Sequence, residues 1–95
     1  MRVVLVSEAR LELREATEWY AARSLVTARR FVDEFKRVKG LVADAPMQWA
    51  EILPGVRRAL FRKFPFALIY SVEGGRVRVL AVKHHKRRPL YWLGR

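Results

Sequence analysis

The segment from Pro46 to Gly55 divides the chain into two halves with different residue patterns. It contains two prolines and a glycine and shows no sustained period, which is typical of a connection. Before this segment the apolar residues recur at helical spacing, and after it they follow the patterns of strands. Ninety-five residues suit one domain. We therefore expect a single domain over residues 1–95, with helices in its first half and strands in its second.

The first half predicts a short strand followed by two helices. Residues 2–6 are mostly β-branched, and Ser7 stands where a helix N-cap is expected. A second helix is expected to begin after Ser24 or Thr27 and to end before Pro46. Helical spacing places Ala9, Leu13, Ala16 and Tyr20 on one face of the first helix and leaves Glu12, Arg14, Glu15 and Glu18 mainly for solvent. The two helices are expected to form a hairpin.

The second half predicts three strands, over residues 56–64, 66–73 and 76–84. Gly74 and Gly75 join the last two as a two-residue hairpin turn. The expected fold is therefore α+β with the order βααβββ, in which the helical hairpin packs on one face of an antiparallel sheet. The opposite face of the sheet is left available for binding.

The basic charge of the chain lies almost entirely in the second half. Residues 1–45 hold nine Lys and Arg against seven Asp and Glu, whereas residues 46–95 hold eleven against two. A one-sided basic field attracts polyanions and speeds their encounter with the protein. Nucleic acid, a nucleoprotein or an acidic protein is therefore the expected partner, although a basic surface that only confers solubility has the same composition.

Several classes of protein are excluded by composition. The chain has no cysteine, so neither a disulfide framework nor a thiolate zinc site is available, and two histidines alone make a poor metal set. We expect no metal and no cofactor. No apolar stretch reaches the length needed to cross a bilayer, and no signal peptide is evident. A cytoplasmic protein without membrane contact is expected.

Motifs along the whole chain resemble those of one known family. The first helix carries Ala9 and Leu13 followed by Trp19-Tyr20, and the second carries Ala28 and Phe31. The sharper motifs are VRRALFRKFPFALIY at residues 56–70 and VLAVKHHKRRPLYW at residues 79–92. Together they resemble the ParE/RelE toxins of type II toxin–antitoxin systems, and within them the plasmid-stabilisation group, with Phe66 in place of the usual tyrosine.

The resemblance implies a toxin that a small cognate antitoxin neutralises, forming a hetero-oligomer with it. It leaves the target open, because ParE-type members are gyrase poisons and RelE-type members are ribosome-dependent mRNA endonucleases. We favour the ParE-like alternative, in which the chain inhibits DNA gyrase by binding and has no active site. The RelE-like enzyme is the alternative from another class, and a partner-binding remnant without toxicity is a third.

If the chain is a nuclease, it needs a proton acceptor, a proton donor and cations for the phosphate. The candidates for these roles are His84, His85, Tyr91, Arg62 and Arg87. Strand alternation predicts that His84 shares a face with Leu80 and Val82, that His85 faces the other way, and that Arg57 and Arg58 also lie on opposite faces. A simpler interpretation of Tyr91 and of Trp92 is that they pack and fasten the tail.

If the chain is a binding inhibitor, the last strand and the tail form its working surface. The residues predicted to contact the target are Arg58, Arg62, Lys83, His85, Arg87, Arg88, Tyr91 and Trp92. A domain this small has little capacity to cover all of its apolar surface, and the antitoxins of the family lay a helix and an extended segment on their toxins. The aromatic residues of the helices, Trp19, Tyr20, Phe31 and Phe35, are therefore predicted to contact the antitoxin.

Overall fold

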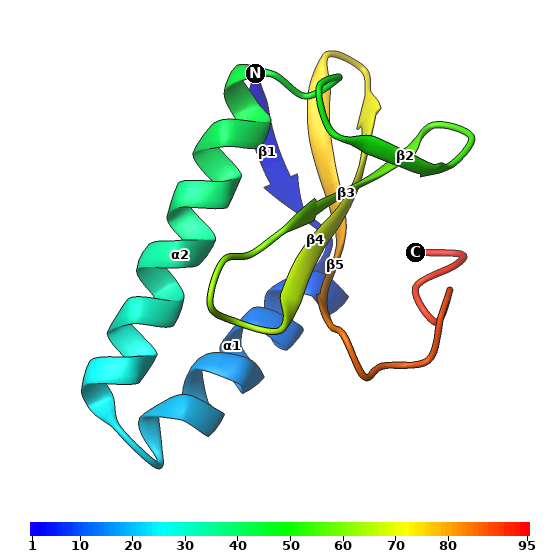
Figure 1. Ribbon diagram of the computed structural model, residues 1–95. Helices are drawn as coiled ribbons and strands as arrows, with labels where there is room; N and C mark the ends of the chain where they lie inside the picture. Colours follow the sequence, from blue (N-terminus) through cyan, green and yellow to red (C-terminus); the bar gives the residue numbers. More distant parts are fainter.

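Two helices and five strands make up the chain, which the computed structural model describes over residues 1–95 (Figure 1). In chain order the elements are β1 (Arg2–Leu5), α1 (Ser7–Ala21), α2 (Leu25–Asp44), β2 (Ala50–Leu53), β3 (Val56–Leu60), β4 (Phe66–Glu73) and β5 (Arg76–His84). The predicted α+β architecture, a helical hairpin packed on a sheet, is confirmed, and one further strand, β2, joins it. Neither helix is long and apolar enough to cross a membrane.

The two helices begin in different ways. Ser24 is the N-cap of α2, and its side chain accepts a hydrogen bond from the backbone N–H of Thr27 at 3.2 Å, as expected of a capping serine. Ser7, in contrast, is already the first helical residue of α1, where Val6 occupies the N-cap position without a side-chain cap. The Ser7 hydroxyl donates to the Glu8 carboxylate instead. The predicted N-cap role of Ser7 is therefore wrong by one residue.

The sheet has the strand order β1-β5-β4-β3-β2. All neighbours are antiparallel except β1 and β5, which run parallel from Arg2↔Arg76 to Leu5↔Val79, so the sheet is mixed and not purely antiparallel as predicted. The extra strand β2 lies within the segment predicted as a connection. Its four residues have no strand pattern of their own, and they become a strand by pairing with β3.

The central hairpin of β4 and β5 contains the predicted glycine turn and an irregularity that was not predicted. Gly74 and Gly75 have φ of 58° and 72°, a left-handed conformation that glycine adopts at little cost. Between Ile69 and Tyr70 the register shifts, since Ile69 pairs with Ala81 whereas Tyr70 pairs with Val79. Leu80 is the extra residue of this bulge. It therefore packs on the face opposite Val82 and His84, which corrects the face predicted by strict alternation.

The main core lies between the helices and one face of the sheet. Helix residues Phe31, Phe35 and Val38 pack there against Leu68 and Tyr70 of β4, all at most 7% exposed. A second, smaller cluster of Ile69, Leu80, Ala81 and Trp92 covers part of the other face. We call that other face, which the helices leave free, the open face. Figure 1 shows α2 and the C-terminal segment on opposite sides of the sheet.

Candidate functional site

A groove of about 500 Å³ lies on the open face of the sheet. Arg58 of β3 pairs with Ile69 of β4, and Ala67 of β4 pairs with Lys83 of β5, so these four side chains point to the same face. His85, just after β5, follows the same alternation. We call this cavity the open-face groove, and its lining residues are Ile52, Arg58, Leu60, Ala67, Ile69, Lys83, His85, Pro89, Leu90 and Trp92.

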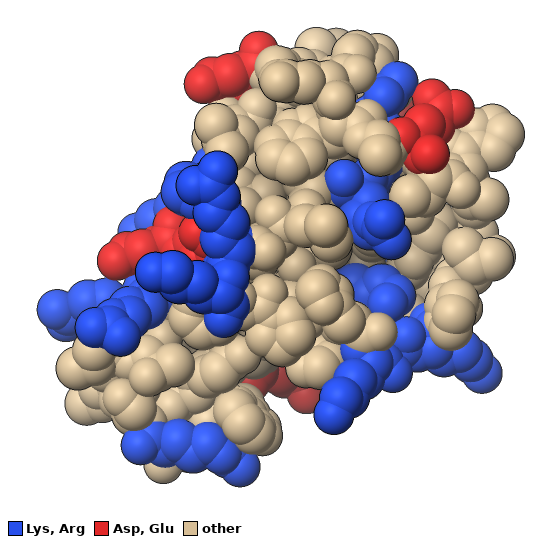
Figure 2. Space-filling view, viewed as in Figure 1, with Lys and Arg blue, Asp and Glu red and all other residues tan.

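The open-face groove combines an apolar lining with basic side chains and contains no acidic residue. None of Arg58, Lys83 and His85 forms an ion pair with a carboxylate of the chain. Leu60 and Leu90 are 49% and 43% exposed at its margins. Toward the lower right of Figure 2, where Figure 1 places the C-terminal segment, further basic side chains gather. Such a groove is complementary to a partner that presents both acidic and apolar side chains.

Arg57 differs from its neighbour Arg58 because its guanidinium is satisfied within the chain. It donates to the carbonyl oxygens of Met47 at 3.1 Å and Trp49 at 2.7 Å, and it forms an ion pair with Glu51 at 3.2 Å. The two arginines thus lie on opposite faces, as strand alternation predicts. Arg57 fastens the segment that contains β2, and Arg58 remains free to bind a partner.

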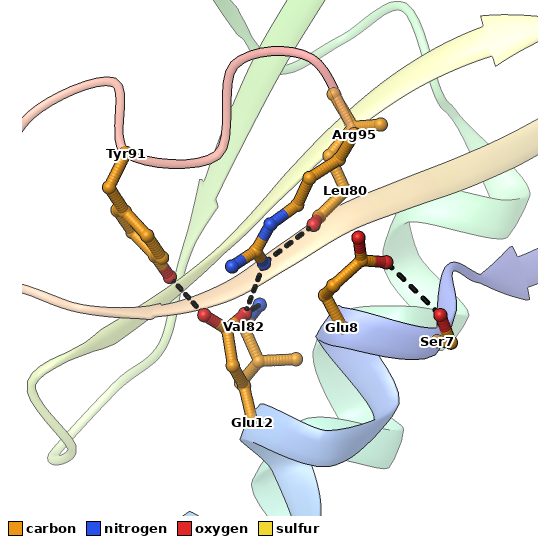
Figure 3. Close-up of polar contacts among 7 residues, drawn as sticks. All are labelled: Ser7, Glu8, Glu12, Leu80, Val82, Tyr91 and Arg95. Carbon is orange, nitrogen blue, oxygen red and sulfur yellow. Dashed lines mark hydrogen bonds and ion pairs between the residues drawn. The ribbon is translucent and has the colours of Figure 1, made fainter.

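Residues 85–95, which we call the tail, contain no helix or strand and are held in place by Glu12 of α1 (Figure 3). The Glu12 carboxylate accepts hydrogen bonds from the Tyr91 hydroxyl at 2.6 Å, from Nη1 of Arg95 at 2.9 Å and from the backbone N–H of Val82 at 3.0 Å. Burial, reinforced by the bond to Glu12, raises the pKa of Tyr91 well above its usual range. Its proton is therefore held on the phenol oxygen.

A second groove, of about 580 Å³, lies between α1, the end of β5 and the tail. We call it the helix-side groove, and it is lined by Glu12, Glu15, Ala16, Trp19, Tyr20, Pro65, Phe66, Val82, His84, Arg87 and Tyr91. The Arg87 guanidinium lies 4.1 Å from the centroid of the Tyr91 ring, a cation–π contact. Unlike the open-face groove, this cavity carries both acidic and basic side chains.

His84 lies in the helix-side groove and is engaged on two sides. Its ring packs edge-on against Phe66 at 4.9 Å between centroids, and its Nδ1 accepts a hydrogen bond from the backbone N–H of Lys86 at 3.0 Å. Burial lowers the pKa of His84, and the neighbouring charges of His85, Lys86 and Lys83 lower it further. The neutral imidazole is therefore favoured at neutral pH.

The five candidate catalytic residues do not converge on one point. His84, Arg87 and Tyr91 share the helix-side groove, whereas His85 lines the open-face groove. Arg62 lies in the connection from β3 to β4, and its backbone N–H donates to Glu34 of α2 at 2.6 Å. In the helix-side groove the Tyr91 hydroxyl is bonded to Glu12, and Glu12 and Glu15 would repel a phosphate.

Most of the predicted contact residues line one of the two grooves. Arg58, Lys83, His85 and Trp92 line the open-face groove, although Trp92 is only 2% exposed and mainly packs. Arg88 is exposed on the tail. Of the residues predicted to contact an antitoxin, Trp19 and Tyr20 line the helix-side groove, and Trp19 is 54% exposed.

The other two residues of that set, Phe31 and Phe35, lie in the core at 0% and 7% exposure. They have no surface to offer a partner, so we leave them out of the contact set. Sequence reasoning also missed Glu12, which it assigned to solvent. No signal in the helical spacing indicates that the tail returns to this residue. No three His, Asp or Glu side chains are grouped as a metal site would require.

Two comparisons with known proteins find similarity along most of the chain. The family model described as "ParE toxin of type II toxin-antitoxin system, parDE" matches residues 3–89. A solved structure titled "Chromosomal ParDE TA system from P. aeruginosa" has a chain with a similar fold, with a TM-score of 0.75 and 22% sequence identity. The match covers 88% of this chain and 95% of that one. Comparison with curated protein sequences finds no match.

Proposed function

The chain belongs to the ParE toxin family of type II toxin–antitoxin systems, and on this basis we propose that it inhibits DNA gyrase by binding it. The toxin acts without making or breaking a covalent bond, and a cognate antitoxin neutralises it in a hetero-oligomeric complex. Because gyrase acts in the cytoplasm, we expect the toxin to act there as well. The family match confirms the predicted family and toxin class. The gyrase target and the cognate antitoxin are proposed.

The observation that carries the proposal is the division of the candidate catalytic residues. Cleavage of RNA through its 2′-hydroxyl needs an acid, a base and cations around one phosphate. Here His84 and His85 lie in different grooves, and the Tyr91 hydroxyl is bound to the Glu12 carboxylate. An arrangement of this kind favours a binding protein over a nuclease.

The open-face groove is the proposed contact with gyrase. Its two cationic residues, Arg58 and Lys83, have no acidic partner within the chain, so their charges remain available to a partner, and His85 adds a polar ring beside them. Exposed Leu60 and Leu90 add apolar surface at its margins. A protein segment with carboxylates beside apolar side chains would satisfy both features. Arg88, which is exposed and directly precedes Pro89 of the groove lining, extends this basic surface.

The helix-side groove is the proposed contact with the antitoxin. Trp19 has a half-exposed ring, and Tyr20 packs beside it with ring centroids 5.2 Å apart. Large aromatic rings at the margin of a cavity are typical anchors of protein interfaces. An antitoxin segment with apolar side chains for these rings and an acidic side chain for Arg87 would fit the groove.

Induction of the chain alone in cells tests the proposal. We expect DNA breaks and SOS induction within minutes, with messages intact. Cleaved messages within translated reading frames, with intact DNA, would instead identify an mRNA endonuclease. If induction produces neither DNA breaks nor cleaved messages, the chain is a partner-binding remnant without toxicity.

Two pairs of variants sharpen this test. A binding inhibitor should tolerate His84→Gln combined with Arg87→Gln, both in the helix-side groove, and should lose more from Arg58→Gln combined with Lys83→Gln in the open-face groove. Loss of toxicity only in the first pair would point to catalysis.

A further inference from the structure

Glu12 connects three segments that are far apart in the sequence. It lies on α1, and its carboxylate accepts hydrogen bonds from β5 at Val82 and from the tail at Tyr91 and Arg95 (Figure 3). Its side chain is only 12% exposed, and that of Arg95 is 15% exposed. Charge-assisted hydrogen bonds in a partly buried setting are stronger than those between neutral groups. Glu12 is therefore well placed to fix the tail.

The tail attaches where the sheet lacks a strand. β1 pairs with β5 only as far as Val79, so beyond that residue β5 has no neighbouring strand on this side. There the carbonyl of Leu80 accepts from Nη1 of Arg95 at 3.1 Å, and the N–H of Val82 donates to Glu12. The side chains of Glu12 and Arg95 thus satisfy two backbone groups of an edge that would otherwise be open.

Few other polar contacts hold the tail. Arg78 donates to the carbonyl of Arg95 at 3.0 Å, and the remaining backbone bonds of the tail are mostly local, such as Leu93 to Leu90. Leu90 has φ of +61°, a left-handed conformation that is unfavourable for a leucine. The surroundings must therefore hold this segment in place, and the bonds at Glu12 together with the buried Trp92 ring do so.

The same segment forms one wall of the open-face groove. Pro89, Leu90 and Trp92 line it beside Arg58, Lys83 and His85, while Tyr91 between them turns to the helix side and bonds Glu12. We propose that Glu12 is a positioning residue for the open-face groove, because it fixes the wall that the tail contributes without lining that groove itself. This inference rests on the proposed function for its consequence, weaker target binding, and on the structure alone for the position of the tail.

Three variants and one control test the inference. Glu12→Gln removes the charge and keeps one oxygen that can accept from Val82, whereas Glu12→Ala removes every acceptor. Arg95→Ala removes the partner of Glu12 on the tail. Because the tail contains no helix or strand, this substitution is not expected to impair folding. Glu18→Gln is the control, because it removes the same charge from the same helix at a side chain that is 69% exposed.

Hydrogen exchange and gyrase affinity are the two measurements. We expect the tail amides of Leu93 and Arg95 to exchange about tenfold faster in Glu12→Gln and in Arg95→Ala, and faster still in Glu12→Ala. The amides of β4 and the paired part of β5 should stay protected, which shows that the fold is retained. Gyrase affinity should fall about tenfold in Glu12→Gln and in Arg95→Ala, and further in Glu12→Ala. Glu18→Gln should change neither the exchange rates nor the affinity.

Two results would overturn the inference. The first is unchanged exchange of the tail amides in Glu12→Ala, and the second is faster exchange with unchanged gyrase affinity. If the unsubstituted chain does not bind gyrase at all, the proposed function fails. In that case the exchange measurement alone decides whether Glu12 holds the tail.

Discussion

His84 and His85 are consecutive in the sequence and lie in different grooves on opposite faces of the sheet. The ring of His84 packs on Phe66 in the helix-side groove, and His85 lines the open-face groove with Arg58 and Lys83. The two residues at the end of β5 therefore have different environments and different expected roles, and each can be changed without altering the other face.

Loss of the basic side chains of the open-face groove should weaken gyrase binding. Arg58→Gln, Lys83→Gln and His85→Ala should each lower the affinity about tenfold, because the first two remove a charge and the third removes a polar ring that faces the partner. Titration of labelled toxin with purified gyrase measures the effect. The matched control is Arg30→Gln, an exposed arginine of α2 without an ion pair. An equal loss in this control would show that net charge alone matters.

Trp19 should contribute more to antitoxin binding than to stability. Because its ring is half-exposed but still packs on Tyr20 and against the Arg23 guanidinium, Trp19→Ala should lower the free energy of unfolding by about 1 kcal/mol. It should weaken antitoxin binding by about 2 kcal/mol, the effect typical of an aromatic anchor. Calorimetry with the purified antitoxin measures this. Leu25→Ala, at a 78% exposed apolar residue outside the helix-side groove, serves as the control, and equal effects of the two would place the contact elsewhere.

Acid should destabilise the fold through His84. Burial lowers the pKa of His84 below its ordinary value of 6.5, so the unfolded chain binds a proton more readily than the folded one. The free energy of unfolding should therefore fall as the pH decreases from 7.5 through 6.5. In this range Glu8 and Glu34, whose pKa values are lowered from 4.5, remain ionised. Thermal unfolding at pH 7.5 and 5.5 should show a smaller difference in His84→Gln, and an unchanged difference would assign the effect to another group.

Glu34 should stabilise the connection between β3 and β4. Its carboxylate accepts from Nε and Nη2 of Arg37 at 2.7 Å each and from the backbone N–H of Arg62 at 2.6 Å, and its side chain is 11% exposed. Glu34→Gln should lower the free energy of unfolding by about 1–2 kcal/mol, because it weakens three charge-assisted bonds. Urea denaturation measures this, and Glu18→Gln, whose ion pair with Arg14 is exposed, should cost less than about 0.5 kcal/mol.

The sequence predicts much of this fold because local patterns determine most of it. The helical spacing of Ala9, Phe31 and Val38 and the Gly74-Gly75 turn are visible in the chain itself, and the structure confirms them. β2 was missed because its strand character arises from pairing with β3 and not from its own residues. The face of Leu80 was wrong because one extra residue in a strand reverses the alternation at that position, and no residue type marks the bulge.

The candidate site was predicted less completely than the fold. The charge distribution indicated that the basic side chains lie mainly in the second half of the chain. Strand alternation correctly placed His84 and His85 on opposite faces of the sheet, and likewise Arg57 and Arg58. The role of Glu12 depends on a contact with Tyr91 and Arg95, which lie at the other end of the chain. Helical spacing describes only neighbours on the same helix, so it has no information about such a contact.

The pairing of β1 with β5 has a consequence for the order in which the protein is made. β1 precedes both helices in the chain, yet its only strand partner is β5, the last strand of the sheet, and the bond from Tyr91 to Glu12 joins residues that are 79 positions apart. Pairings of such large sequence separation form late. A chain that is still being synthesised therefore lacks β5, which contributes His84 to the helix-side groove and Lys83 to the open-face groove, so neither groove can form before this strand is available.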